Sequence, residues 1–267
     1  MAGNSNSKFN HIVITGASSG IGEALALYYA AQGVRLSLTG RDAGRLAGVA
    51  DQCRERGAHV AFAMLSVTDR EGMRDWLQKI DADFPVDVVI ANAGISAGMG
   101  KSKGIENPEQ VREIFSVNVT GVFNTIEPLL PRMVERGNGH IVLMSSLAGF
   151  RGWPSAPAYS ASKAAVRAYG EALLGALART GVRIHVVTPG FVHSRITDVN
   201  DFPMPFIMTS KRAAEIIAGG IERGRGRIAF PLITYFFVWL LSALPDCIAV
   251  SIQKGLPTKR ELIREEK

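Results

Sequence analysis

Cysteine is scarce in this chain of 267 residues, which contains only Cys53 and Cys247, far apart in the sequence. Neither belongs to a Cys-x-x-Cys pair or to a Cys/His cluster, so the sequence supports no disulfide framework and no structural zinc site. A chain of this length can bury most of its unfolded surface and needs no covalent or metal staple. We therefore expect two reduced thiols and no bound metal.

The sequence also lacks a secretion signal and a nucleic-acid-binding pattern. Its first residues are polar, without a basic start, an apolar stretch or a small-residue cleavage site. The net charge is +6, but no run of Lys and Arg alternates with aromatic residues. The basic cluster Arg223, Arg225 and Arg227 is typical of a solvated surface. We expect a cytoplasmic protein, or one that faces the cytoplasm, and no nucleic-acid partner.

Short apolar segments alternate with longer helical patterns along most of the chain. Seven segments are candidate strands: 11–16, 34–40, 58–65, 86–94, 139–146, 182–190 and 227–231. Helical patterns cover 20–32, 43–56 and 210–223. Because the apolar runs show no polar alternation, we expect strands that are covered on both faces. The order predicts one α/β domain over 1–267, a doubly wound parallel sheet of about seven strands with helices on both faces.

The first candidate strand ends in a glycine-rich turn, Thr15-Gly16-Ala17-Ser18-Ser19-Gly20-Ile21-Gly22. A strand that enters a helix through a tight turn leaves free N–H groups at the start of that helix, and these groups favour an anion such as a pyrophosphate. Glycine permits positive φ and lets a phosphate approach the backbone closely. The turn, placed in the first strand–helix unit, therefore predicts dinucleotide binding.

Tyr159 and Lys163 are four residues apart in a segment that has a helical composition, so both side chains share one face. A free tyrosine has a pKa near 10, and a nearby ammonium favours its phenolate form. A tyrosine tuned in this way can exchange a proton with a substrate oxygen.

Taken together, these motifs make the chain resemble the short-chain dehydrogenase/reductase family over about residues 10–230. The glycine spacing, Asn92-Ala93-Gly94, the Tyr-x-x-x-Lys pair and Pro189-Gly190 occur in the family's order. The resemblance implies that Ser146, thirteen residues before Tyr159, donates a hydrogen bond to the substrate carbonyl oxygen. Ser145 remains the alternative.

The resemblance also implies a fourth catalytic residue and a set of cofactor contacts. Asn118 matches the position at which the family bends a helix and holds a water molecule that links the lysine to solvent. The implied cofactor-binding residues are Thr15, Gly16, Ser18, Ser19, Gly20, Ile21, Gly22, Arg41, Ser66, Val67, Asn92, Ala93, Gly94, Tyr159, Lys163, Pro189, Gly190, Val192 and Ser194.

Three positions decide how closely the cofactor site follows the family. Gly40 stands where an acidic residue would select NAD(H), and Arg41 follows it, which favours NADP(H) over NAD(H). We interpret Asp42 as the cap of the next helix. Ser66-Val67 replaces the usual Asp-Val beside the adenine, and Ser194 replaces a common Thr while keeping a hydroxyl group.

The segment 191–225 is the expected substrate loop and helix. It contains the apolar residues Phe191, Phe202, Met204, Phe206, Ile207 and Met208. No acidic cluster or basic fork suggests a charged substrate. We therefore expect a carbonyl or alcohol substrate that is apolar or lipid-like.

The tail, 231–267, begins with a strongly apolar stretch, and no charge occurs between Ile228 and Pro245. Three alternatives remain for it: a buried lid or subunit interface, a segment that lies in the membrane surface on the cytoplasmic face, or a membrane span. A homodimer or homotetramer is expected.

The sequence therefore favours an NADP(H)-dependent oxidoreductase that moves a hydride between nicotinamide and a carbonyl or alcohol. The alternative from another class is a catalytically silent NADP-binding regulatory protein on the same fold. An epimerase or dehydratase is disfavoured by chain length and glycine spacing.

Overall fold

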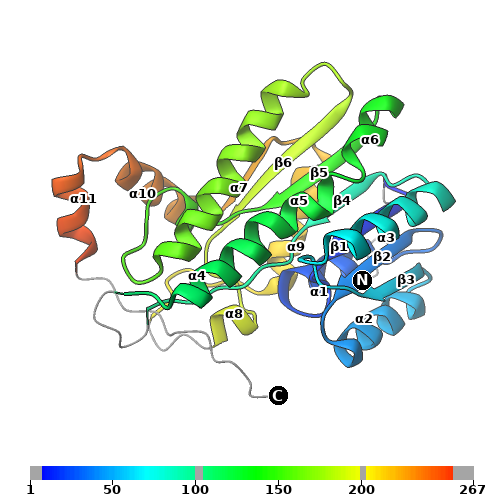
Figure 1. The fold of residues 1–267 in the computed structure, drawn as a ribbon, viewed down its shortest axis with the longest axis horizontal. Helices are drawn as coiled ribbons and strands as arrows, with labels where there is room; N and C mark the ends of the chain where they lie inside the picture. Colours follow the sequence, from blue (N-terminus) through cyan, green and yellow to red (C-terminus); the bar gives the residue numbers. More distant parts are fainter. Residues whose placement is uncertain (1–7, 100–104, 199–202, 255–267) are drawn as a thin grey trace.

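Seven parallel strands form one sheet in the computed structural model, which describes residues 8–99, 105–198 and 203–254 (Figure 1). The strands lie in the order β3-β2-β1-β4-β5-β6-β7. Their bounds are β1 His11–Thr15, β2 Arg35–Gly40, β3 His59–Met64, β4 Val88–Ala91, β5 Gly139–Met144, β6 Val182–Pro189 and β7 Arg227–Phe230. The strand order reverses between β1 and β4, and the carboxyl ends of the strands meet at this point.

Helices cover both faces of the sheet, as the sequence predicts. One apolar core packs α1 (Gly20–Tyr29), α2 (Ala43–Glu55) and α9 (Ser210–Glu222) on one face. The other core packs α3 (Arg70–Asp83), α4 (Pro108–Phe115), α5 (Gly121–Ile126) and α7 (Pro157–Ala176) on the opposite face. Successive side chains of a strand alternate between the two cores, so that Ile12 and Ile14 enter one and Val13 enters the other.

The outer strand β3 differs from the prediction that apolar strands are covered on both faces. Most of its residues are exposed, including the large side chains of Phe62 and Met64. The physical reason is its place at the edge of the sheet, where it pairs with β2 alone. An apolar run identifies a strand, but it does not say how many neighbours the strand has.

Local sequence signals account for the helix boundaries near the site. The Asp42 side chain accepts a hydrogen bond from the backbone N–H of Arg45 at 2.9 Å, and the predicted cap of α2 is therefore present. The predicted loop after β6 contains a short helix, α8 (Arg195–Asp198), and a bridge between Val192 and Met208. Two further short helices are η2 (Leu147–Gly149) and α6 (Leu130–Arg136).

The apolar tail forms two short helices, α10 (Leu232–Ala243) and α11 (Asp246–Gln253), separated at Pro245. They lie at one end of the molecule, beyond α7 and away from α1–α3 (Figure 1). Within the described ranges, no helix combines the length and the apolar character required to cross a membrane.

Candidate active site

The turn between β1 and α1 brings the backbone against the end of β4. Gly16 has a φ of +66° and Gly20 a φ of +61°, values that residues with a side chain rarely adopt. A Cβ on Gly16 would lie 2.8 Å from the Cα of Ala93, and a Cβ on Gly22 would overlap the carbonyl oxygen of Gly16. The turn therefore requires glycine and leads directly into the amino end of α1.

A cleft of about 570 Å³ opens beside this turn and is lined on one side by Ser18, Ser19 and Gly20. The loop after β6, including Ser194, lines the other side. A Cβ on Gly20 would lie 3.0 Å from the Cβ of Ser194, so the two predicted cofactor segments face each other. The Ser19 side chain makes no capping bond to α1, and the first N–H groups of that helix remain donors for an anion. These donors and the glycine cradle fit the pyrophosphate of a dinucleotide.

Asn92 ties the end of β4 to the glycine turn. Its Nδ2 donates to the carbonyl oxygens of Thr15 at 2.9 Å and Gly16 at 3.2 Å. The Thr15 hydroxyl in turn accepts from the backbone N–H groups of Asn92 at 3.1 Å and Ala93 at 3.2 Å. Hydrogen bonds therefore join two motifs that are 77 residues apart in the sequence.

The end of β2 has little space for an acidic side chain. A Cβ on Gly40 would lie 3.2 Å from the Cβ of Ser18. Arg41 follows and is exposed, while the carboxylate of Asp42 is engaged by Arg45 at 2.7 Å. The cation at Arg41 therefore stands where the ribose end of a dinucleotide is expected, and Asp42 is held at the start of α2.

Ser66 and Val67, the residues predicted on the adenine side, lie two and three residues beyond β3. The Ser66 hydroxyl lies 2.8 Å from that of Thr68 and also accepts from the Thr68 backbone N–H at 3.3 Å. Val67 is buried, and its carbonyl oxygen accepts from Nδ2 of Asn124 at 2.8 Å. The hydroxyl that replaces the usual acid is thus bound to its own neighbour in the loop.

Tyr159 and Lys163 lie one turn apart at the amino end of α7, and Ser146 is the second residue after β5. The Tyr159 phenol forms hydrogen bonds with the side chains of Ser146 and Ser96. Nζ of Lys163 lies 5.9 Å from the centre of the Tyr159 ring and donates to the Met144 carbonyl oxygen at 2.9 Å. The structure therefore brings the predicted phenol, ammonium and hydroxyl groups together.

Burial acts on both titrating groups of this cluster. It raises the pKa of the Tyr159 phenol, and the hydrogen bonds with Ser146 and Ser96 oppose that change. Burial lowers the pKa of Lys163 to about 8 from its ordinary value of 10.5. A phenol that keeps its proton near neutral pH can act as a general acid toward a substrate oxygen.

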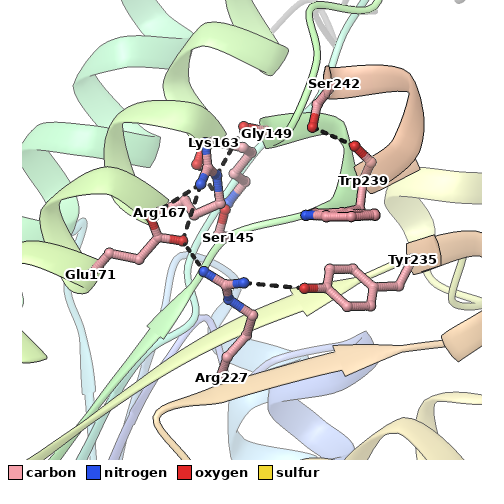
Figure 2. Close-up of polar contacts among 9 residues, drawn as sticks. All are labelled: Ser145, Gly149, Lys163, Arg167, Glu171, Arg227, Tyr235, Trp239 and Ser242. Carbon is pink, nitrogen blue, oxygen red and sulfur yellow. Dashed lines mark hydrogen bonds and ion pairs between the residues drawn. The ribbon is translucent and has the colours of Figure 1, made fainter. Parts of the chain in front are cut away.

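The two adjacent serines have different partners. The Ser145 hydroxyl donates to the Lys163 carbonyl oxygen at 2.7 Å and so ties β5 to the backbone of α7 (Figure 2). The Ser146 hydroxyl accepts from the Ala148 N–H at 3.1 Å and contacts the Tyr159 phenol. This geometry favours Ser146 as the group that meets substrate, with Ser145 as a structural neighbour.

Asn118 lies in a π-helical turn, Ser116–Thr120, which joins α4 to α5 and carries one residue more than an α-helix would. The side chain is fully buried. Its Oδ1 accepts from the Ile95 N–H at 2.8 Å, and its Nδ2 donates to the Ile95 carbonyl oxygen at 2.9 Å. Nδ2 also donates to the Ser162 hydroxyl at 3.0 Å. The predicted irregularity of this helix is therefore present, and Asn118 connects the loop after β4 to α7.

Pro189-Gly190, at the end of β6, lies beside Ser146. The Ser146 hydroxyl lies 3.5 Å from the Pro189 carbonyl oxygen. Thr197 fixes the following loop, because its hydroxyl donates to the Val192 carbonyl oxygen at 2.9 Å and accepts from the Ser194 N–H at 2.9 Å. The predicted residue Phe202 lies outside the described residues.

Sequence reasoning missed three residues that support this site. Ser96 binds the Tyr159 phenol, and Ser162 accepts from Asn118 while donating to the Tyr159 carbonyl oxygen at 2.7 Å. Glu106 accepts from the Ala158 N–H at 2.8 Å and so supplies the cap that α7 lacks in its own sequence. Burial raises the pKa of Glu106. The contacts of Ser96 with Tyr159, of Glu106 with Ala158 and of Ser162 with Asn118 each join α7 to a segment that is distant in the sequence, so no local motif marks them.

The described residues contain no group of three or more His, Cys, Asp or Glu side chains that could hold a metal ion. Cys53 is buried in α2 and Cys247 is exposed in α11. The groups that converge at the site are thus a phenol, an ammonium, hydroxyls and an amide.

Comparison with known proteins gives matching results. The sequence profile of the short chain dehydrogenase family matches residues 10–201. A protein of Myxococcus xanthus described as an uncharacterized oxidoreductase is 42% identical over 221 residues, covering 82% of this chain and 86% of that protein. A similarly described protein of Staphylococcus saprophyticus is 36% identical over 192 residues, covering 71% and 81%.

Solved structures show the same fold with bound dinucleotides. A short-chain dehydrogenase of Sphingobium yanoikuyae in complex with NADPH is similar with a TM-score of 0.77 and 24% identity, covering 96% of this chain and 98% of that one. A Burkholderia phymatum protein of this type in complex with NAD has a TM-score of 0.80 and 25% identity, covering 95% and 98%. A 3-ketoacyl-ACP reductase of Sinorhizobium meliloti has a TM-score of 0.74 and 28% identity, covering 85% and 99%.

Proposed function

Because the chain belongs to the short-chain dehydrogenase family of oxidoreductases, we propose that it transfers a hydride between NADP(H) and the carbonyl or alcohol carbon of an apolar substrate. One observation supports this proposal above the others. Ser146, Tyr159 and Lys163 converge at the carboxyl edge of the sheet, beside the glycine turn. The protein's acid–base group and its dinucleotide cradle therefore lie at the same edge of the sheet.

The glycine turn and the amino end of α1 would hold NADPH, which would supply a hydride for the carbonyl carbon in the reducing direction. Ser146 donates a hydrogen bond to the carbonyl oxygen as negative charge develops there. The Tyr159 phenol gives its proton to that oxygen and completes the alcohol. The Lys163 ammonium stabilises the phenolate that remains, because the two charges are opposite and the site is partly shielded from water.

Asn118 and Glu106 hold the catalytic side chains in place. Asn118 fixes the loop after β4 and, through Ser162, the first turn of α7. Glu106 fixes the Ala158 N–H, one residue before Tyr159. Positioning of this kind matters because a small displacement of a reacting group lowers the rate steeply.

The choice of NADP(H) rests on Gly40 and Arg41. The limited space at Gly40 disfavours a carboxylate that would bind a ribose hydroxyl, and the exposed Arg41 offers a planar fork to a 2′-phosphate. Arg41→Ala should raise the KM for NADPH roughly tenfold to a hundredfold, the loss expected for charged hydrogen bonds, and leave the KM for NADH nearly unchanged. Equal effects on both cofactors would contradict this role.

An apolar substrate is supported by the loop after Gly190. Met208 donates its N–H to the Phe191 carbonyl oxygen at 3.1 Å, so the apolar segment 203–208 folds back beside the start of the loop. The 3-ketoacyl-ACP reductase among the solved relatives, by its name, acts on a ketone with an acyl chain.

Oxidation of NADPH against matched short polar and long apolar aldehydes and ketones tests the function. We expect higher kcat/KM for the long apolar compounds and loss of turnover in Tyr159→Phe, which should still bind NADPH. Preference for the short polar set would reject the substrate class. Cofactor binding without turnover of any carbonyl would support the silent regulatory alternative.

A further inference from the structure

The outward face of α10 is apolar. No residue of this helix is buried, and Leu232 and Phe237 are 74% and 63% exposed. The large exposed side chains of the helix are Leu232, Ile233, Phe236, Phe237, Trp239 and Leu240. This face is exposed to solvent in the isolated chain, whereas the solvent-facing side of a surface helix ordinarily carries polar residues.

The inward face of α10 carries its polar side chains. The Tyr235 hydroxyl accepts from Arg227 at 3.1 Å (Figure 2). The Tyr235 ring packs edge-on against Phe150, with ring centres 5.5 Å apart. Thr234 Oγ1 is shielded from water. The Ser242 hydroxyl donates to the Trp239 carbonyl oxygen at 2.7 Å within the helix. The polarity of α10 is therefore the reverse of that of a surface helix in water.

A chain of charged groups fixes the orientation of α10. Glu171 of α7 accepts from Arg167 at 3.0 Å and from Arg227 at 2.6 Å, and Arg227 reaches Tyr235 (Figure 2). This network fixes which side of α10 meets the protein and leaves the apolar side outward.

The loop that follows Ser146 holds the end of α10 and the helix α11. Arg151 pairs with Asp246 at 2.6 Å. Gln253 donates to the Gly152 carbonyl oxygen at 2.7 Å. The two helices are therefore attached to the segment that joins Ser146 to Tyr159.

Helix α11 also exposes large apolar side chains. Ile248 and Val250 are each 48% exposed, and Ile252 is 53% exposed.

We propose that the outward face of α10 and α11 docks on a lipid bilayer surface. The twelve residues of α10 extend about 18 Å, less than the roughly 30 Å of a bilayer core, so the helix would lie along the surface. Trp239, which is 49% exposed, is a residue type that favours the membrane interface. The stretch between Ile228 and Pro245 is uncharged, and the exposed Lys254 at the end of α11 offers an ammonium group to phosphate headgroups.

Sedimentation of the full chain with phosphatidylcholine vesicles tests the docking. We expect the wild type to sediment with the vesicles. Phe236→Ser combined with Phe237→Ser should weaken binding roughly tenfold or more, because two exposed rings are lost from the contact. The matched control, Phe62→Ser with Val134→Ser, removes exposed apolar side chains of β3 and α6 and should bind like the wild type. Unchanged NADPH binding shows that each variant is folded.

Two results would overturn the proposal. In the first, the wild type stays in the supernatant with all vesicles and is a monomer by analytical ultracentrifugation. The face then has no lipid partner. Alternatively, the wild type ignores vesicles but forms a dimer that the Phe236/Phe237 variant dissociates, which assigns the face to a second copy of the chain.

Docking has a consequence for catalysis that rests on the proposed function, whereas vesicle binding does not. Because α10 and α11 are attached to the loop between Ser146 and Tyr159, docking would bring the site close to chains dissolved in the bilayer. Vesicles should then raise turnover of a long-chain ketone in the wild type, but not in the Phe236/Phe237 variant. Turnover of a short soluble aldehyde should stay the same. Vesicle binding without any turnover would reject the proposed function alone.

Discussion

Helices α9 and α10 follow each other in the chain and have similar lengths, but they turn opposite kinds of side chain toward water. α9 buries Ile217 and Ile221 against the sheet and exposes Lys211 and Arg212. α10 buries no residue, exposes its large apolar side chains and turns Tyr235 toward the protein. Both helices are rich in apolar residues, so apolar content alone does not distinguish a core helix from a docking helix. What distinguishes them is the face that meets the rest of the protein.

The sheet and its covering helices differ in the same way from the two C-terminal helices, because we expect the sheet to hold the catalytic residues and the stable core. The largest expected effect on activity is at the end of β5. Ser146→Ala should lower kcat about 100-fold to 1000-fold, the loss typical of an oxyanion donor. Ser145→Ala is the matched control, because that hydroxyl binds the backbone of α7 instead of the phenol. Steady-state kinetics of both variants measure the difference. A larger loss in Ser145→Ala would reassign the catalytic hydroxyl.

Truncation of matched apolar side chains tests the contrast between α9 and α10 directly. Ile217→Ala should lower the free energy of unfolding by about 2–5 kcal/mol, because the fully buried side chain leaves a cavity. Phe237→Ala should change it by less than about 0.5 kcal/mol, because that ring lies in solvent. Urea unfolding in the absence of lipid gives both values. A loss in Phe237→Ala comparable to that in Ile217→Ala would show that α10 belongs to the folded core.

Lys163 should make stability depend on pH. Burial lowers its pKa to about 8, so between about pH 8 and pH 10.5 the unfolded chain holds more protons than the folded one. Stability rises with pH wherever the unfolded state binds more protons. Lys163→Met should therefore be more stable than the wild type at neutral pH, by roughly 2 kcal/mol, and this gap should narrow through that window.

Urea unfolding of both proteins across the pH range measures the gap. Lys211→Met, on the exposed face of α9, controls for the loss of a positive charge from the surface. A gap that stays constant from neutral to alkaline pH would show that Lys163 is not penalised by burial.

The smallest expected effect concerns the cap of α7. Glu106→Ala should lower kcat several-fold and the free energy of unfolding by about 1 kcal/mol, the usual loss for a helix cap. Glu106→Gln keeps an acceptor oxygen and should restore most of kcat, while KM for NADPH stays the same in both variants. Equal kcat in Glu106→Ala and Glu106→Gln would show that the cap does not position Tyr159.

The sequence predicted the parts of the structure that depend on local pattern. The strands, the glycine turn and the Asp42 cap follow from apolar runs, backbone freedom and side-chain hydrogen bonding near the helix start. The roles of Ser96 and Glu106 did not follow, because each contact joins a loop to the first turn of α7, and that approach depends on the whole sheet. Which face of α10 meets the protein was equally hidden. Apolar residues occur around most of the circumference of this helix, so the sequence pattern marks no inner face. The contact of Arg227 with Tyr235 shows which face is the inner one.

The π-helical turn at Ser116–Thr120 has a consequence for two loops at once. One additional residue rotates everything after it by about 100° relative to an uninterrupted α-helix. Asn118 can therefore point to the loop after β4, while Asn124, six residues later, reaches the Val67 carbonyl oxygen in the loop after β3. A single inserted residue thus lets one continuous helical segment hold both loops, and deleting it would misalign one of the two.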